Sequence, residues 1–168
     1  ASEIYRHLRA GAESGWDFSS RWFRDGLHFE TIHTTEIVPV DLNLLLWNLE
    51  QTISEACLLN DDPDAEAFAL LAQKRLAAIQ KYCWNDALGF YTDFDTSIGK
   101  PKEILSLAAT MPLFFNVASN EQAHRMQEII RDRFLFPGGL VATLQETGQQ
   151  WDAPNGWAPL HWITIRGL

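Results

Sequence analysis

The sequence predicts an all-α fold built from paired helices, on three observations. Apolar residues recur every three or four positions over several long segments, whereas alternating stretches are short. Loops rich in Trp, Asp and Gly separate these segments, and no repeat of fixed period is found. The chain has 168 residues and no Gly/Ser-rich or Pro-rich linker. We therefore expect residues 1–168 to form a partial single domain of stacked α-hairpins.

Three segments in the first half of the chain have helical periodicity. Polar or Pro-containing runs separate them, and Ser2 and Asp41 can act as N-caps of the first and second helices. The expected helices cover residues 2–9, 41–59 and 65–82.

The second half is expected to contain a short β-hairpin and three further helices. The β-hairpin turns at residues 85–89, and a short extended piece covers 140–144. Pro112 should kink or split the first of these helices, and Asn120 can cap the second. The expected helices cover residues 105–117, 121–134 and the chain from 156 onward.

Composition argues against several classes of protein. The formal net charge is −9, so the surface would repel phosphate, and we expect neither nucleic acid nor a membrane as a partner. The longest apolar runs are too short to cross a bilayer. Seven Trp residues offer flat apolar faces that suit carbohydrate, although a helix core rich in aromatic residues explains them equally well.

The cysteine and histidine residues predict no metal centre. Cys57 and Cys83 lie on separate helical segments without a Cys-x-x-Cys or Cys/His cluster, so we expect buried, reduced thiols. Reduced thiols weakly favour a cytoplasmic location over a periplasmic one. His28 and His33 lack partners at the spacing of metal ligands and are interpreted as surface histidines.

A first loop, residues 13–22, reads Glu-Ser-Gly-Trp-Asp-Phe-Ser-Ser-Arg-Trp. Asp17 lies between two aromatic residues and near Gly15, where a backbone can approach a ligand closely. Apolar neighbours disfavour an ionised carboxylate, as a general acid working near neutrality requires. Arg21, four residues further on, could pair with Asp17 if the segment is helical. The spacing alone favours a different role for Asp17, as the N-cap of a short helix.

A second loop, residues 149–159, reads Gln-Gln-Trp-Asp-Ala-Pro-Asn-Gly-Trp-Ala-Pro. Amide and carboxylate groups hydrogen-bond sugar hydroxyls, and indole faces cover the C–H patches of a pyranose. A rigid Pro/Gly turn whose Trp side chains fill a neighbouring core is an equally good interpretation.

The two loops resemble the S-G-W-D-[FY]-S-S-R-W and Q-W-D-x-P-x-G-W-A-P signatures of the trehalase family. Residues 34–43 and 137–140 are similar to that family in order and spacing, so the resemblance covers essentially the whole chain. It implies part of an (α/α)6 barrel with short hairpin and loop insertions, whose loops at one end form a sugar pocket. It also implies hydrolysis of the disaccharide α,α-trehalose to two glucoses with inversion, without a metal or cofactor.

The resemblance also implies roles for individual residues. Asp17 matches the general acid of the family, which replaces its interpretation as a helix cap. The expected substrate-binding positions are Gly15, Gln150, Trp151, Asp152 and Asn155.

The chain departs from the family in what it lacks. An inverting glycosidase needs a second carboxylate as general base, which in trehalases lies in a later G-G-E-Y block that does not occur here. The earlier P-G-G-R-F and R-P-E segments are also absent, and Asp152 as a stand-in base is only a minor alternative. We therefore expect the middle portion of a trehalase that is monomeric when intact. By itself it should be weakly active or inactive, with apolar helix faces left without partners.

Two other functions remain open at this point. The chain could belong to a related α-glucosidase of the same barrel class, which would cleave a glucoside other than trehalose. It could also be a non-catalytic sugar-binding or helical scaffold module that retains the loops for packing.

Overall fold

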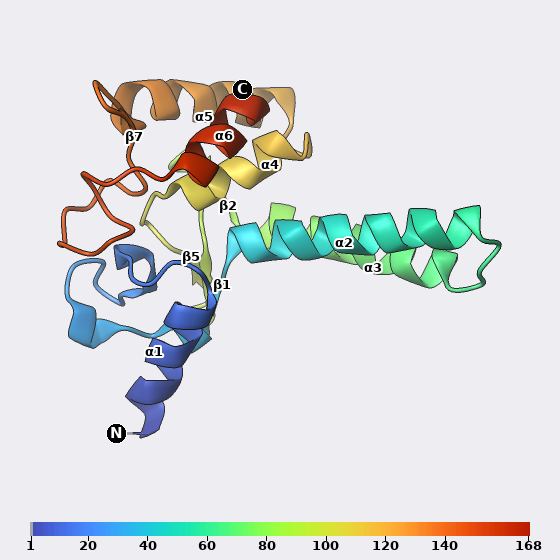
Figure 1. The fold of residues 1–168 in the computed structure, drawn as a ribbon, viewed down its shortest axis with the longest axis horizontal. Coiled ribbons are helices and arrows are strands. Elements are labelled where there is room, and N and C mark those ends of the chain that lie inside the picture. The colour runs from blue at the N-terminus through green and yellow to red at the C-terminus, as the bar shows by residue number, and fades with distance from the viewer. Residues whose placement is uncertain (1) are drawn as a thin grey trace.

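Two long helices, α2 (Val40–Leu59) and α3 (Ala65–Tyr82), form a hairpin that extends away from the rest of the chain (Figure 1). The structure is a computed structural model and describes residues 2–168. Both helices have the bounds that periodicity predicts to within a residue. Asp41 lies in the first turn of α2, and Pro39 is the residue at the cap position. The Asp-Pro segment 61–64 separates the helices, as expected.

The N-terminal helix α1 (Ser2–Glu13) is longer than predicted, so Ser2 lies inside the helix and not at its cap. Its buried His7 contacts Thr35 in the short helix η3 (Thr34–Glu36), with 2.9 Å between Nδ1 of His7 and Oγ1 of Thr35. This contact anchors the N-terminal helix to the segment that leads into α2.

A small antiparallel sheet closes the base of the α2–α3 hairpin. It consists of β1 (Ile37–Val38), β4 (Phe94–Asp95) and β5 (Lys100–Pro101), in the order β1-β4-β5. Ile37 pairs with Asp95, so the sheet joins the chain that enters α2 to the chain that follows α3. Local periodicity cannot reveal a pairing between segments so distant in sequence.

Two β-hairpins complete the strand structure. The first pairs β2 (Trp84–Asn85) with β3 (Phe90–Tyr91) and confirms the expected turn. The second pairs β6 (Leu135–Phe136) with β7 (Gly139–Leu140), at the start of the extended piece expected at 140–144.

The helix expected at 105–117 is split in two. The 3-10 helix η4 (Leu107–Thr110) leads directly into α4 (Met111–Phe114). Pro112 occupies the first turn of α4, where its missing N–H has no partner to lose. The expected interruption at this proline is therefore confirmed.

Helix α5 (Asn120–Ile129) is capped by Ser119 and not by Asn120. The Ser119 hydroxyl accepts from the N–H of Gln122, whose side-chain oxygen accepts from the N–H of Ser119. The helix continues as a π-helical turn, η5 (Ile130–Phe134), which matches the predicted end at residue 134. The remaining helices are η1 (Ser20–Trp22), η2 (Phe29–Thr31) and α6 (Ala158–Gly167).

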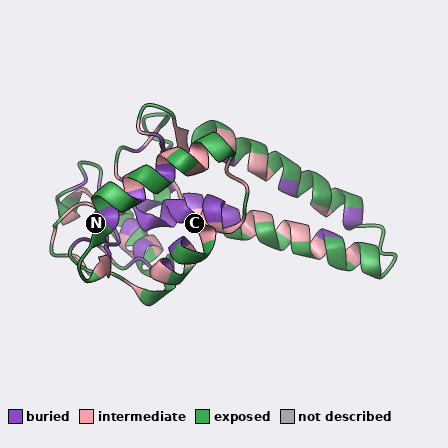
Figure 2. Cartoon of the chain, turned by 90° about the horizontal axis from the view of Figure 1, so that it is seen from above, coloured by how far each residue is buried: buried purple, intermediate pink, exposed green. Residues whose placement is uncertain are grey.

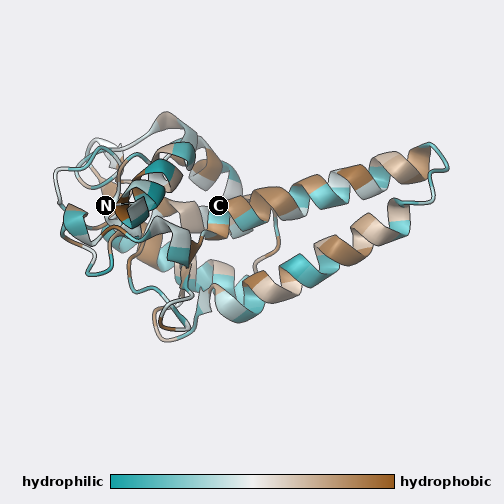
Figure 3. Cartoon of the chain, turned by 90° about the horizontal axis from the view of Figure 1, so that it is seen from below, coloured by the Kyte–Doolittle hydropathy of each residue, from teal (hydrophilic) through white to brown (hydrophobic). Residues whose placement is uncertain are grey.

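The hydrophobic core lies in the body of the molecule, where the loops meet the C-terminal helices. Figure 2 shows buried residues gathered there, whereas much of the α2–α3 hairpin is exposed. Apolar residues nevertheless lie along both hairpin helices (Figure 3), as the expectation of unpartnered apolar faces predicts. The exposed leucines of the hairpin are Leu42, Leu45, Leu49, Leu58, Leu59, Leu70 and Leu71. No helix within residues 2–168 has the length and apolar character needed to cross a membrane.

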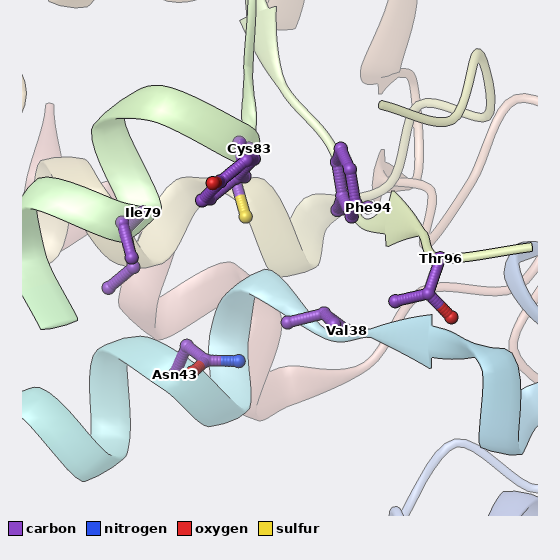
Figure 4. A pocket seen from close by; sticks show the side chains of 8 residues that line it. Val38, Asn43, Ile79, Cys83, Phe94 and Thr96 are labelled. Atoms are coloured by element: carbon purple, nitrogen blue, oxygen red, sulfur yellow. The ribbon is translucent and has the colours of Figure 1, made fainter. Parts of the chain in front are cut away.

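A cavity of about 210 Å³ lies where α2, α3, β1 and β4 meet (Figure 4). Cys83 lines it beside Ile79 and Phe94, and burial raises the pKa of the Cys83 thiol to about 12. Both cysteines are free, but only Cys83 is buried, so the expectation of burial was wrong for Cys57. None of the lining residues belongs to the first or second loop. The lining residues are Val38, Asn43, Ala78, Ile79, Tyr82, Cys83, Phe94 and Thr96.

Candidate active site

The fold brings the two sequence-predicted loops together. The backbone N–H of Trp151 donates to the carbonyl oxygen of Phe18 at 3.0 Å. Beside this bond, the rings of Trp16 and Trp151 lie 5.0 Å apart between centroids. Residues more than 130 positions apart in the sequence are thus in direct contact.

Asp17 is exposed, and the aromatic residues on either side of it pack inward. The Trp16 side chain is buried, and the ring of Phe18 meets Phe29 edge-on with 5.1 Å between ring centroids. The peptide bond between Asp17 and Phe18 is cis. The N-cap of η1 is Ser19, whose hydroxyl accepts from the N–H of Arg21, so the cap interpretation of Asp17 was wrong. The carboxyl group of Asp17 is therefore not used to start the helix.

Arg21 is fully buried and pairs with two acids, neither of which is Asp17. Its guanidinium donates to Asp93 at 2.9 and 2.7 Å and to Asp41 at 2.9 and 3.0 Å. It also lies 4.4 Å from the ring centroids of both Trp16 and Trp22. This network joins the first loop to α2 and to the chain between β3 and β4.

The positive charge of Arg21 favours the ionised form of Asp41, the carboxylate in the first turn of α2. Burial by itself would raise the pKa of Asp41, but attraction to Arg21 and the bonds it donates lower that pKa below its ordinary value. Periodicity could not identify Asp41 and Asp93 as partners of Arg21, because they lie 20 and 72 positions away in the sequence.

Asp152 is also fully buried, and its carboxylate accepts hydrogen bonds from both sides of the junction between the loops. From the first loop it accepts from the Ser19 hydroxyl at 2.9 Å, the Ser20 N–H at 2.8 Å and the Ser20 hydroxyl at 2.7 Å. From the chain leading to the second loop it accepts from the hydroxyls of Thr143, at 2.8 Å, and Thr147. This burial does not support the expected contact of Asp152 with substrate, nor a role as stand-in base.

The second loop presents an aromatic pair and exposed amides. The rings of Trp151 and Trp157 are stacked, with centroids 4.4 Å apart and planes within 13°. The indole N–H of Trp157 donates to the carbonyl oxygen of Gln150, which helps to fix the loop. The side chains of Gln150 and Asn155 are exposed, whereas Trp151 is half-buried. Its indole N–H has no hydrogen-bond partner among the described residues.

Gly15 occupies the open side of the first loop. Its φ of +80° falls in the left-handed region that favours glycine, and no atom lies within 4 Å of where a Cβ would be placed. A small cavity of about 150 Å³ lies beside Trp16, between the first loop and the first turn of α2. The backbone at Gly15 is thus free to approach a ligand.

The two histidines singled out by the sequence differ in environment. His28 is exposed, and its hydrogen bond to Asp25 raises the pKa of the imidazole. His33 is 1% exposed, so its interpretation as a surface residue was wrong. Burial, followed by the positive charge of Lys102 at 3.2 Å, lowers the pKa of His33. Among residues 2–168, no three His, Cys, Asp or Glu side chains are grouped to hold a metal ion.

A long helical hairpin and further packed helices, with a carboxyl group, amides and indoles on the loops beside them, are the architecture expected of part of a helical barrel. The solved neutral trehalase of Saccharomyces cerevisiae matches 99% of the chain with a TM-score of 0.84 at 28% identity, and the chain covers 32% of it. A mannosylglycerate hydrolase from Thermus thermophilus matches 78% of the chain, with a TM-score of 0.65 at 20% identity, and shares the fold alone. The model of the trehalase family matches residues 1–168. The chain belongs to the trehalase family.

Two relatives named periplasmic trehalase match the whole chain. The protein from Xanthomonas campestris is 49% identical and the protein from Pseudomonas aeruginosa is 48% identical. The chain spans 29% and 31% of the lengths of these two relatives.

Proposed function

We propose that the chain is the central part of a trehalase barrel, in which Asp17 is the general acid for the hydrolysis of α,α-trehalose. The observation that carries this proposal is the placement of Asp17. It lies exposed on the first loop, held against the second loop, in a chain of the trehalase family.

In this mechanism the Asp17 carboxylic acid donates its proton to the glycosidic oxygen as the bond between the two sugars breaks. A water molecule attacks the anomeric carbon from the opposite face, which inverts its configuration. The carboxylate that activates this water must lie about 6.5–9.5 Å from the acid, and we expect it outside these 168 residues. Proton transfer between carboxyl groups and water accounts for the whole reaction, so the mechanism assigns no step to a metal or cofactor.

Groups of the second loop, which contacts the first loop beside Asp17, are proposed to bind the sugar. The amides of Gln150 and Asn155 can hydrogen-bond hydroxyl groups. Trp151 is stacked on Trp157 and contacts Trp16, so we expect it to meet the sugar through its ring edge, where its indole N–H has no partner among the described residues. Gly15 leaves space for close approach of the backbone. The chain contributes only part of the pocket, because it spans about a third of the length of its relatives or less.

The names of the relatives support a periplasmic location over the cytoplasmic one that the cysteines favoured. The proteins from Xanthomonas campestris and Pseudomonas aeruginosa are both named periplasmic trehalase. A monomeric state of the complete enzyme remains an expectation.

The test of this function is Asp17→Asn in the complete enzyme that carries the segment. An amide cannot donate the proton, so we expect kcat for trehalose to fall about 10²-fold or more, with little change in KM. The matched control is Asp61→Asn, which removes an exposed carboxyl at the tip of the α2–α3 hairpin, where φ is +52° and Asn is well tolerated.

Unchanged turnover in Asp17→Asn would instead support the non-catalytic module. Assays with a panel of α-linked glucosides separate trehalase from a related α-glucosidase. A higher kcat/KM for a glucoside other than trehalose would contradict the proposed substrate.

A further inference from the structure

We propose that Asp152 is a positioning residue, which holds the first loop so that Asp17 is placed for proton transfer. This inference rests on the proposed role of Asp17 as general acid. It assigns to Asp152 a task different from contact with the sugar, because its carboxylate is enclosed by protein.

Asp152 cross-links the two loops through a single carboxylate. Its donors on one side, Ser19 and Ser20, lie two and three positions after Asp17. Its donors on the other side, Thr143 and Thr147, belong to the chain that leads into the second loop. The two sides are separated by more than 120 positions in the sequence, so this junction forms only when the tertiary structure does.

Breaking the hydrogen bonds to the Asp152 carboxylate would be energetically costly. The side chains of Asp152, Ser19, Ser20 and Thr143 are all fully buried, so none can exchange its partner for water. Hydrogen bonds to an ionised carboxylate are stronger than those between neutral groups. Loss of the acceptor would leave several buried hydroxyl and N–H donors unsatisfied. The first loop would then shift to find other partners.

Such a shift would also move Asp17, because only Phe18 lies between Asp17 and Ser19. The carbonyl group of Phe18 accepts from the N–H of Trp151, immediately before Asp152. The second loop therefore holds the backbone on the C-terminal side of Asp17 at two adjacent places. A displacement of about 1 Å at a catalytic group can reduce a rate about 10²-fold.

The decisive experiment compares two substrates in the complete enzyme. Breaking the glycosidic bond of trehalose requires a proton on the departing oxygen. In α-D-glucosyl fluoride the C–F bond breaks and fluoride leaves with the bonding electrons, while water adds to the anomeric carbon and gives up a proton to the base. The second reaction therefore needs little help from the general acid.

We expect Asp152→Asn to lower kcat for trehalose about 10²-fold and kcat for the fluoride less than tenfold. Asp17→Asn should show the same selective pattern. The ratio of the two kcat values is the readout, because it does not depend on how much of each variant is folded. A role in stability alone would leave this ratio unchanged.

The control for loss of a buried carboxylate is Asp95→Asn. Asp95 is also buried, but it accepts hydrogen bonds from Ser97 in its own turn and not from the first loop. We expect this variant to melt at a lower temperature with an unchanged ratio of kcat values.

Ser20→Ala provides a second variant in case Asp152→Asn does not fold. It removes one buried hydroxyl donor and leaves the carboxylate in place, so we expect a selective loss of about tenfold. A ratio unchanged from the parent enzyme in Asp152→Asn, or in Ser20→Ala if only that variant folds, would overturn the positioning role. An unchanged ratio in Asp17→Asn would count against the proposed general acid instead.

Discussion

Two buried ionisable groups near the candidate acid are stabilised in different ways. The Arg21 guanidinium is matched by the carboxylates of Asp41 and Asp93 and lies between two indole rings. The Asp152 carboxylate is surrounded by hydroxyl and N–H groups of Ser and Thr residues and the backbone. If one residue of either cluster is removed, its buried partners lose their hydrogen bonds and cannot replace them with water. We therefore expect mutations in both clusters to destabilise the fold.

Arg21→Gln should destabilise the fold strongly. The substitution leaves Asp41 and Asp93 in the protein without their cation, and breaking a buried ion pair in this way costs about 3–5 kcal/mol. Urea unfolding of the complete enzyme, followed by circular dichroism, measures the change in the free energy of unfolding.

The matched control for Arg21 is Arg9→Gln. Arg9 forms an exposed pair with Glu13 on α1, where water replaces the lost bonds. We expect no measurable change in the unfolding curve of this variant. Equal unfolding curves for the two variants would contradict the structural role assigned to Arg21.

At the scale of elements, the α2–α3 hairpin is held together by polar contacts as well as apolar ones. Arg75 on α3 donates to Glu50 at 2.6 Å and to Asn43 at 2.9 Å, both on α2. Near the tip, the Ser54 hydroxyl donates to the carbonyl oxygen of Ala65 at 2.8 Å. These bonds set how the helices face each other and leave Leu42, Leu45 and Leu49 exposed on one stripe of α2.

Replacement of two stripe residues, Leu45→Gln with Leu49→Gln, should act in opposite directions in the two forms of the protein. In the isolated 168-residue chain it should reduce self-association, because less apolar surface is exposed. In the complete enzyme, other helices of the barrel are expected to cover the stripe, so buried Gln side chains should cost about 1–3 kcal/mol each. Sedimentation velocity measures the first effect and urea unfolding the second.

Asn48→Gln is the control on the same helix, because it replaces one exposed amide by another. It should change neither measurement. Full stability of the complete enzyme carrying both leucine substitutions would show that nothing covers the stripe.

At the scale of the whole molecule, the proposed mechanism gives the chain one of the two carboxylates that inversion requires. It matches trehalases over its full length but spans only 29% of the Xanthomonas campestris protein. The remaining side chains of the sugar pocket, and the base, are expected from the rest of the barrel. On this proposed division, we expect trehalose hydrolysis from the complete enzyme only.

The isolated chain should therefore release no glucose from trehalose above an Asp17→Asn control. Without a base across the sugar ring, no group activates the water, although the acid is present. A coupled glucose assay at high protein concentration tests this, and the complete enzyme serves as the positive control. Glucose release that depends on Asp17 would mean that a base lies within these residues.

The local features of the fold could be predicted from the sequence. The apolar periodicity of 41–59 and 65–82, with an Asp-Pro break between them, predicted α2 and α3 to within a residue. Pro112 predicted the division of one helix. The caps were less predictable, because Ser119 and Asn120 are adjacent residues that both favour the cap position. Their choice depends on backbone geometry that composition does not contain.

By itself, the sequence determined the helical class, the long hairpin and the family, because helix formation depends on neighbours a few residues apart and the two signatures are dense with uncommon residues. Only the tertiary structure decided the partners of the buried charges. In the folded chain Arg21 forms ion pairs with Asp41 and Asp93, Asp152 is buried and Asp17 is exposed. A buried charge pairs with whichever group the fold places within about 3 Å, and residues 20 to 133 positions away offer no local pattern from which to predict that group.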